Sequence, residues 1–241
     1  MKKSRREIEK MIKPNFLLTE MDWVTIAEEL NKEGFVKIPE LLNNKNMKID
    51  EFYSDKATSS DAVTTPDYLN DLEMEDGENS QIILSNFINE IFYDKLHSIA
   101  DDWSVKLGES YHDEDSYGSS SIKFNNLSKH LGKLNIFILN ENDNLPLQQH
   151  SRDSNIFPFK LVGLLSTPSC DFTGGELVMV EQRPRMQSRA IVVTLMKGDV
   201  AIVATYYRPI KKNGGYYRAL IKNGISIVRS GKRIGWEIMY D

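Results

Sequence analysis

Basic side chains are concentrated in one part of the 241-residue sequence. Between Arg183 and Arg233 it has twelve basic residues and a single acidic one, Asp199. A guanidinium group matches a carboxylate with two parallel hydrogen bonds, so several of these arginines could converge on an anionic small molecule. The alternative is a solvated basic face that attracts the carboxylate-rich stretch from Asp50 to Asp115. Composition alone leaves both interpretations open.

The overall composition limits the class of protein. The chain has a formal net charge of −5, 40% hydrophobic residues and a single cysteine, Cys170. The acidity weighs against a general nucleic-acid binder, and one cysteine excludes an internal disulfide and a multi-thiolate zinc site. No apolar run approaches the roughly 18 residues of a membrane span, and the basic start leads into no secretory apolar stretch. We therefore expect a soluble, cytoplasmic protein without nucleic-acid or membrane partners.

The first half of the sequence predicts helices and long loops. We expect residues 1–18 to form a flexible N-terminus, and Thr19 to begin a helix that Gly34 ends. Apolar residues at helical spacing predict a second helix, namely Leu84, Phe87, Ile88, Ile91, Ile99 and Trp103. The polar stretches 43–80 and 109–132 are predicted loops, and the first could also act as a lid.

The second half predicts a β-rich core. Turn signals such as Gly174-Gly175, where the backbone needs a positive φ, separate short strand-like runs. The predicted strands are 133–139, 156–165, 176–181, 188–195, 200–206, 216–221, 225–228 and 233–240, with an earlier short strand at 35–39. This spacing suggests a sandwich, jelly roll or barrel. We expect an α+β, mainly β fold in one domain at 19–241, with a helical and loop part at 19–115 and a β core at 130–241.

Several short motifs carry a resemblance to a known protein family. They are Asp171-Phe-Thr-Gly-Gly-Glu-Leu177, Glu181-Gln-Arg-Pro-Arg-Met-Gln-Ser-Arg189, Lys197-Gly-Asp199, Arg208-Pro209, Gly215-Tyr-Tyr-Arg218, Asn223-Gly-Ile-Ser226, Ser230-Gly-Lys-Arg233 and Met239-Tyr-Asp241. On these residues the sequence resembles a bacterial family of 2-oxoglutarate/Fe(II)-dependent oxygenases. The resemblance implies a double-stranded β-helix (jelly roll), preceded and buttressed by N-terminal helices. It also implies an oxidoreductase, a dioxygenase that uses 2-oxoglutarate and iron to hydroxylate a small molecule.

The resemblance also assigns the iron ligands. The family binds iron with a His-x-Asp/Glu pair and a distant histidine, and leaves the opposite face of the metal open. In this sequence the three positions fall on Gln148, His150 and Asn223. A glutamine, one imidazole and an asparagine supply no negative charge. We therefore expect these residues to bind Fe(II) more weakly than the family's ligands do.

Two other pairs could rebuild a metal site. His150 and Asp153 form a His-x-x-Asp pair, which needs a turn or bulge because this spacing places the two side chains on opposite faces of a strand. His112 and Glu114 form a His-x-Glu pair in a predicted loop. A metal-free barrel could instead use His150 as a catalytic general base.

The resemblance is stronger at the cosubstrate end of the site. Arg233 follows Asn223 by ten residues, the spacing at which the family places the arginine that binds the far carboxylate of 2-oxoglutarate. Arg218 and Arg229 also match family positions, and Arg218 is a second candidate for cofactor binding. We therefore expect the cosubstrate carboxylate to bind at Arg233.

Two functions from different classes remain open. One is an active oxygenase that oxidises a small molecule with Fe(II) and 2-oxoglutarate. The other is a pseudo-oxygenase that binds a carboxylate or a partner protein and catalyses nothing. The segment from Glu181 to Arg189 fits both, because it is either a hairpin of interlocking polar groups or a set of arginines at the barrel mouth that bind an anionic substrate. The sequence does not define the oligomeric state.

Overall fold

The structure is a computed structural model that describes residues 21–42, 67–68, 80–108, 132–149 and 157–240. The helices of this part of the chain are α3 (Trp23–Glu33) and α4 (Ser80–Leu107). The strands are β1 (Phe35–Ile38), β2 (Asp67–Tyr68), β3 (Lys133–Leu139), β4 (Leu145–Gln148), β5 (Phe159–Leu164), β6 (Phe172–Gly174), β7 (Leu177–Gln182), β8 (Arg189–Val193), β9 (Val200–Ala204), β10 (Tyr207–Lys212), β11 (Gly215–Ile225), β12 (Val228–Gly231) and β13 (Arg233–Met239). Neither helix is long and apolar enough to cross a membrane.

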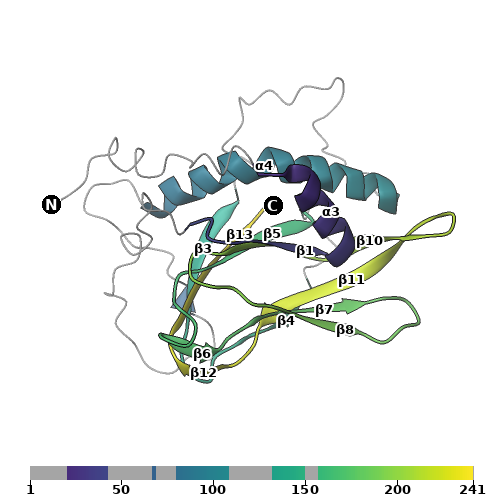
Figure 1. The fold of residues 1–241 in the computed structure, drawn as a ribbon. Helices are drawn as coiled ribbons and strands as arrows, with labels where there is room; N and C mark the ends of the chain where they lie inside the picture. The colour runs from purple at the N-terminus through teal and green to yellow at the C-terminus, as the bar shows by residue number, and fades with distance from the viewer. Residues whose placement is uncertain (1–20, 43–66, 69–79, 109–131, 150–156, 241) are drawn as a thin grey trace.

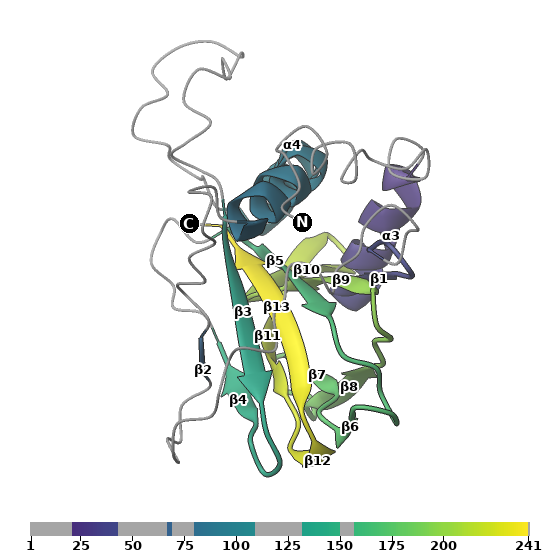
Figure 2. The ribbon, with the colours of Figure 1, turned by 90° about the vertical axis from the view of Figure 1, so that its left-hand side faces the viewer.

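The strands form two antiparallel sheets that face each other (Figure 1). The large sheet has the strand order β1-β9-β5-β13-β3-β2, and the small sheet has the order β10-β11-β7-β8, with β4 paired to β11. Figure 2 shows β6 and β12, which pair with each other, at the end of the molecule away from the helices. This arrangement confirms the predicted jelly roll with helices against it.

Helix α3 begins later than the sequence predicts. The carboxylate of Asp22 accepts hydrogen bonds of 3.1 Å from the backbone N–H groups of Val24 and Thr25, so the helix begins at Trp23 and not at Thr19. An aspartate in this position satisfies donors that have no partner inside the helix. The predicted end is confirmed, because Gly34 has a φ of 79°.

Most of the predicted strands are confirmed, and the differences have local causes. The bounds of β3 are those predicted, whereas the predicted strand at 225–228 is wrong, because β11 continues to Ile225 and β12 begins at Val228. Strands β2, β4, β6 and β10 were not predicted, and β2 lies within the predicted loop 43–80. Strands β4 and β10 each contain a proline, a residue that argues against a strand when it is met in a sequence. Pro209 is tolerated because β10 lies at the edge of its sheet.

The main apolar core lies between α4 and the outer face of the large sheet. Its fully buried side chains include Phe92, Leu96, Trp103, Leu161, Ile202 and Trp236. Each such burial stabilises the fold by about 1.5–3 kcal/mol. The rings of Trp103 and Phe159 pack edge to face with centroids 4.6 Å apart, so odd-numbered residues of β5 face the helix. Lys160 therefore points the other way, towards the small sheet.

The space between the two sheets is called the barrel interior here. Arg233 of β13 faces it, because its side chain donates a hydrogen bond to the carbonyl of Gly175, just before β7 of the small sheet. Glu237 lies four residues further along the unbroken register of β13 and shares this face. From the small sheet, Asn223 reaches across to the carbonyl of Ala204 in β9 of the large sheet.

Candidate functional site

Arg233 is a buried cation of the barrel interior. The residue is 1% exposed, its Nε donates a 2.8 Å hydrogen bond to the carbonyl oxygen of Gly175, and its guanidinium carbon lies 5.5 Å from the centroid of the Phe137 ring. The Nη1 atom is buried and, among the residues that the structure describes, has no hydrogen-bond partner. Because a buried charged donor without a partner is costly, this atom is suited to a ligand that brings an acceptor.

Two glycines, Gly175 and Gly235, leave space for the Arg233 side chain. A Cβ atom at Gly175 would lie 2.8 Å from Cδ of Arg233, and one at Gly235 would lie 2.5 Å from its Nη1. The aliphatic part of the side chain therefore passes Gly175, and the guanidinium lies beside Gly235. Gly175 also has a φ of 64°, which confirms the predicted positive φ at this turn.

The electrostatics of Arg233 favour an anionic ligand. Burial lowers the pKa of the Arg233 guanidinium to about 10, and the negative charge of Glu176 opposes this shift. Glu176 accepts a hydrogen bond from the hydroxyl of Ser226, which lowers the pKa of the Glu176 carboxyl. A carboxylate placed at Nη1 would compensate for the lost hydration of the guanidinium.

Two of the positions that the resemblance assigns to iron ligands lie side by side. Gln148 and Asn223 are Cα partners between β4 and β11. Asn223 is 2% exposed, and its Nδ2 donates a 3.3 Å hydrogen bond to the carbonyl oxygen of Ala204. Both side chains are neutral amides, and that of Asn223 already binds the backbone. These two residues do not fit Fe(II), which is held by carboxylates and imidazoles.

The remaining predicted metal ligands cannot be placed. In the described ranges, no group of three His, Cys, Asp or Glu residues is arranged to hold a metal ion. His150 and Asp153 lie outside these ranges, as do His112 and Glu114. Iron binding by any of these four residues, and catalysis by His150, stay predictions.

The structure does not bring Arg218 to Arg233. Arg218 lies on the opposite face of β11 from Asn223, and its Nη2 donates a 3.1 Å hydrogen bond to the carbonyl oxygen of Leu107, the last residue of α4. Its guanidinium carbon also lies 5.7 Å from the centroid of the Tyr207 ring. A cation at the C-terminus of a helix interacts favourably with the helix dipole. A role for Arg218 in cofactor binding stays a prediction.

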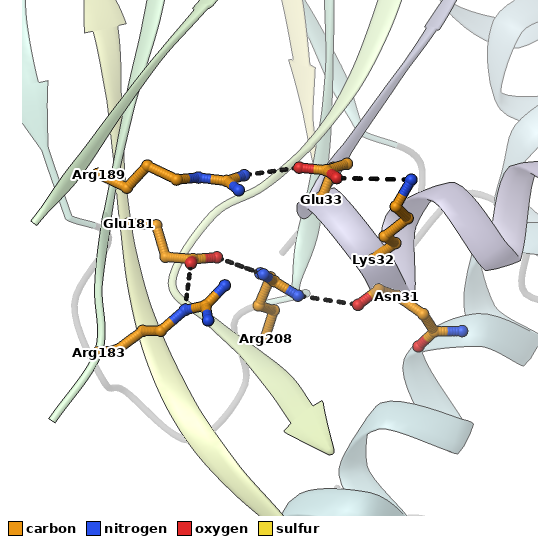
Figure 3. Close-up of polar contacts among 7 residues, drawn as sticks. All are labelled: Asn31, Lys32, Glu33, Glu181, Arg183, Arg189 and Arg208. Carbon is orange, nitrogen blue, oxygen red and sulfur yellow. Dashed lines mark hydrogen bonds and ion pairs between the residues drawn. The ribbon is translucent and has the colours of Figure 1, made fainter. Parts of the chain in front are cut away.

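Two arginines of the segment from Glu181 to Arg189, namely Arg183 and Arg189, bind acidic side chains of the protein itself (Figure 3). Glu181 is 1% exposed, and its two oxygens accept hydrogen bonds from Nε of Arg183 at 2.6 Å and from Nε of Arg208 at 2.5 Å. Arg208 also donates a 2.8 Å hydrogen bond to the backbone carbonyl of Asn31. We call Glu181, Arg183, Arg208 and the Asn31 carbonyl the Glu181 network. It joins β7 and β10 to α3.

Arg189 makes a separate ion pair with α3. Its Nη2 lies 2.6 Å from Oε2 of Glu33, and this hydrogen bond lowers the pKa of the Glu33 carboxyl (Figure 3). Together with the pairing of β7 and β8, these contacts support the hairpin interpretation of the segment from Glu181 to Arg189. Arg185 is exposed at the turn of this hairpin.

Sequence reasoning missed one charged pair in the barrel interior. Nζ of Lys160 lies 2.9 Å from Oε2 of Glu237, and their side chains are only 10% and 13% exposed. The signal was a charged residue among apolar neighbours: Lys160 is the charged residue of Phe159–Leu164, and Glu237 lies between Trp236 and Ile238 in Arg233–Met239. Their partnership could not be read because the two residues lie 77 positions apart in the sequence.

The fold resembles those of solved oxygenases. One is an oxidoreductase of the 2OG-Fe(II) oxygenase family from Burkholderia pseudomallei, with 13% sequence identity, a TM-score of 0.50 and 92% of each chain covered. Another is a prolyl hydroxylase from Trichoplax adhaerens, with 12% identity, a TM-score of 0.50 and coverage of 99% of this chain and 93% of that one. At these identities the likeness establishes the fold alone.

Sequence comparison reaches further than the fold. Two uncharacterised proteins from strains of Mycobacterium tuberculosis are 31% identical to this chain over 153 residues, which are 64% of this chain and 66% of each relative. The match thus spans slightly less than two thirds of the relatives' length. A family model described as "Oxygenase, catalysing oxidative methylation of damaged DNA" matches residues 81–241, which include every strand from β3 to β13. The chain belongs to this oxygenase family.

Proposed function

We propose that this member of the oxygenase family binds a small carboxylate ligand, of the dicarboxylate class that includes 2-oxoglutarate, on Arg233. The observation that carries the proposal is the buried Nη1 atom of Arg233, which has no hydrogen-bond partner among the described residues. It lies beside Gly235, and the guanidinium lies near the Phe137 ring. A carboxylate at this atom would form a charge-assisted hydrogen bond and satisfy the buried donor.

The proposal does not need iron at the family's usual positions. Asn223 uses its amide on the backbone of β9, and Gln148 offers only a neutral amide oxygen or nitrogen. A barrel that binds a carboxylate through Arg233 alone is a pseudo-oxygenase, a binding module that retains the family's fold without its metal chemistry. This is the function that the described residues support best.

The second candidate is a 2-oxoglutarate-dependent dioxygenase that hydroxylates a small molecule. Family membership favours it, and the family match includes the predicted iron ligands His150 and Asp153. In this alternative, bound Fe(II) and 2-oxoglutarate would supply the oxidising chemistry, and Arg233 would bind the far carboxylate of the cosubstrate. One equivalent of tightly bound iron and conversion of 2-oxoglutarate to succinate would favour this candidate over the first.

The size and charge of the ligand also form part of the proposal. The family description names damaged DNA, whereas a formal net charge of −5 disfavours broad contact with a phosphate backbone. We therefore expect an anionic small molecule and no nucleic acid. A fluorescence-polarisation titration with an oligonucleotide that carries a damaged base checks this expectation, and binding in the submicromolar range at physiological salt would contradict it.

Calorimetric titration of the full chain with glutarate and 2-oxoglutarate, in buffer that contains EDTA, tests carboxylate binding. We expect saturable binding that EDTA does not change, and a loss of at least about tenfold in affinity in Arg233→Met, the size of one charge-assisted hydrogen bond. The matched control is Arg189→Gln, which removes an arginine from the ion pair with Glu33 on α3 and should bind as the wild type does. Equal binding by Arg233→Met would overturn the proposal, and binding that requires added Fe(II) would favour the oxygenase.

A further inference from the structure

The Lys160–Glu237 ion pair is a further charged group of the barrel interior, on the same face of β13 as Arg233. Placing two charges in a poorly hydrated space costs several kcal/mol per ion unless good contacts compensate. A lysine ammonium has three donors and a carboxylate has two acceptor oxygens, so the described bond between Nζ and Oε2 leaves hydrogen-bonding capacity on both groups. With 10% and 13% of their side chains exposed, both residues retain some access to solvent.

The pair lies a short distance along β13 from the free donor of Arg233. The guanidinium of Arg233 lies beside Gly235, and Glu237 is two residues further along the same face of the strand. Two residues of an extended strand span about 6.7 Å. Because the Arg233 guanidinium itself lies over Gly235, a short dicarboxylic acid could extend from Nη1 along β13 and reach the ion pair with its other end.

The same pair lies at the level of the barrel where the resemblance places the metal. Asn223 donates its hydrogen bond to Ala204, which is the Cα partner of Phe159, the residue before Lys160. Lys160 therefore brings a positive charge to the level of the interior that Asn223 contacts, one residue along β5 from the partner of Ala204. Glu237 adds a negative charge beside Lys160. This carboxylate would make no favourable contact with a 2-oxo acid, which has no cationic group.

Resting on the proposed function, we propose that the ligand is an amino-dicarboxylic acid, with its distal carboxylate on Arg233, its α-carboxylate on Lys160 and its α-ammonium on Glu237. The three protein groups carry a net charge of +1, and such a ligand carries −1. A 2-oxo acid of the same length carries −2 and offers Glu237 a carbonyl oxygen in place of a cation. The ion pair thus makes the barrel specific for an amino acid over the corresponding oxo acid.

Calorimetric titrations with L-glutamate, 2-oxoglutarate and glutarate in EDTA test this specificity. We expect the wild type to bind L-glutamate at least about tenfold more tightly than the other two, because only L-glutamate pairs with Glu237. Glu237→Gln keeps the shape of the side chain and should lose this preference while its glutarate affinity stays equal or rises. Lys160→Met should weaken all three ligands, and the matched control Glu33→Gln, outside the barrel interior, should change none.

The outcomes separate the specificity from carboxylate binding itself. If the wild type binds the three ligands equally, or if the preference for L-glutamate survives in Glu237→Gln, the role of the ion pair is wrong although carboxylate binding stands. If none of the three binds, or if Arg233→Met binds all three unchanged, the proposed function fails and this inference fails with it. The wild-type comparison needs no variant, so it decides the question even where a substitution prevents folding.

Discussion

Arg208 and Arg233 are both buried arginines of the β core, and their surroundings differ. Arg208 is 2% exposed and donates to the Glu181 carboxylate and to the backbone carbonyl of Asn31. Arg233 is 1% exposed, binds the carbonyl of Gly175 and leaves Nη1 without a partner. Burial lowers the pKa of Arg233 to about 10. Arg208 therefore has a structural role, whereas the burial of Arg233 has an uncompensated cost that a ligand can offset.

Removal of Glu181 should have the largest effect on stability. Glu181→Gln leaves Arg208 buried without a carboxylate, and breaking a buried ion pair in this way typically costs about 3–5 kcal/mol. The free energy of unfolding in urea checks the prediction. The matched control is Arg189→Gln, which breaks a partly exposed ion pair and should cost no more than about 1 kcal/mol. A loss below that of the control would show that the Glu181 network is not what holds α3 to the small sheet.

Arg233→Met should abolish glutarate binding without lowering stability, whereas Glu181→Gln should lower stability. Methionine removes the buried charge and retains an apolar chain beside Phe137, so the free energy of unfolding should equal or exceed that of the wild type. The wild type should gain about 2.7 kcal/mol in glutarate at one hundred times its dissociation constant, and the variant should gain nothing. Urea unfolding with and without glutarate measures both. A variant as unstable as Glu181→Gln would place Arg233 among the structural arginines.

The contrast between the two arginines could be only half predicted from the sequence. The family resemblance, through the spacing between Asn223 and Arg233, implied a ligand arginine. The partners that separate the two cases are distant in sequence: Arg208 binds Glu181, 27 positions away, and Arg233 meets Gly175, 58 positions away. A missing partner at Nη1 leaves no pattern in a sequence, because it depends on every surrounding residue.

The fold could be predicted from the sequence more completely than the site, for a physical reason. The alternation of residues within β3 predicts that strand, and the conformational freedom of Gly34 predicts the end of α3. The Lys160–Glu237 pair depends on the register of β5 against β13, which local patterns do not encode.

The pH dependence of binding sharpens the comparison further. Glutarate needs the protonated guanidinium, so its affinity should be constant up to about pH 9 and fall about tenfold per pH unit above the Arg233 pKa of about 10. The sign for stability is opposite. The folded pKa lies below the ordinary value of an arginine, so the unfolded chain binds more protons in this interval. The contribution of Arg233 to stability therefore rises with pH. Calorimetry at successive pH values, with circular dichroism as a control for folding, measures the binding profile. A decline that begins below pH 8 would assign the titration to another group.

The smallest expected effect concerns Gly235, the residue beside which the Arg233 guanidinium lies. A Cβ at Gly235 would lie 2.5 Å from Nη1 of Arg233 and 2.9 Å from the ring of Phe137, so Gly235→Ala must displace the guanidinium or the ring. Because the end of an arginine side chain moves easily, we expect a cost of about 1 kcal/mol in stability and a loss of less than about tenfold in glutarate affinity.

Gly214→Ala is the matched control for that substitution. Gly214 has a φ of 85° and nothing within 4 Å of an added Cβ, so alanine there strains a turn far from Arg233 and should leave glutarate affinity unchanged. If Gly235→Ala also binds glutarate as the wild type does, the free donor does not need its position beside Gly235. The ligand would then have to meet Arg233 elsewhere in the interior, and the short path along β13 to Glu237 would no longer define its length.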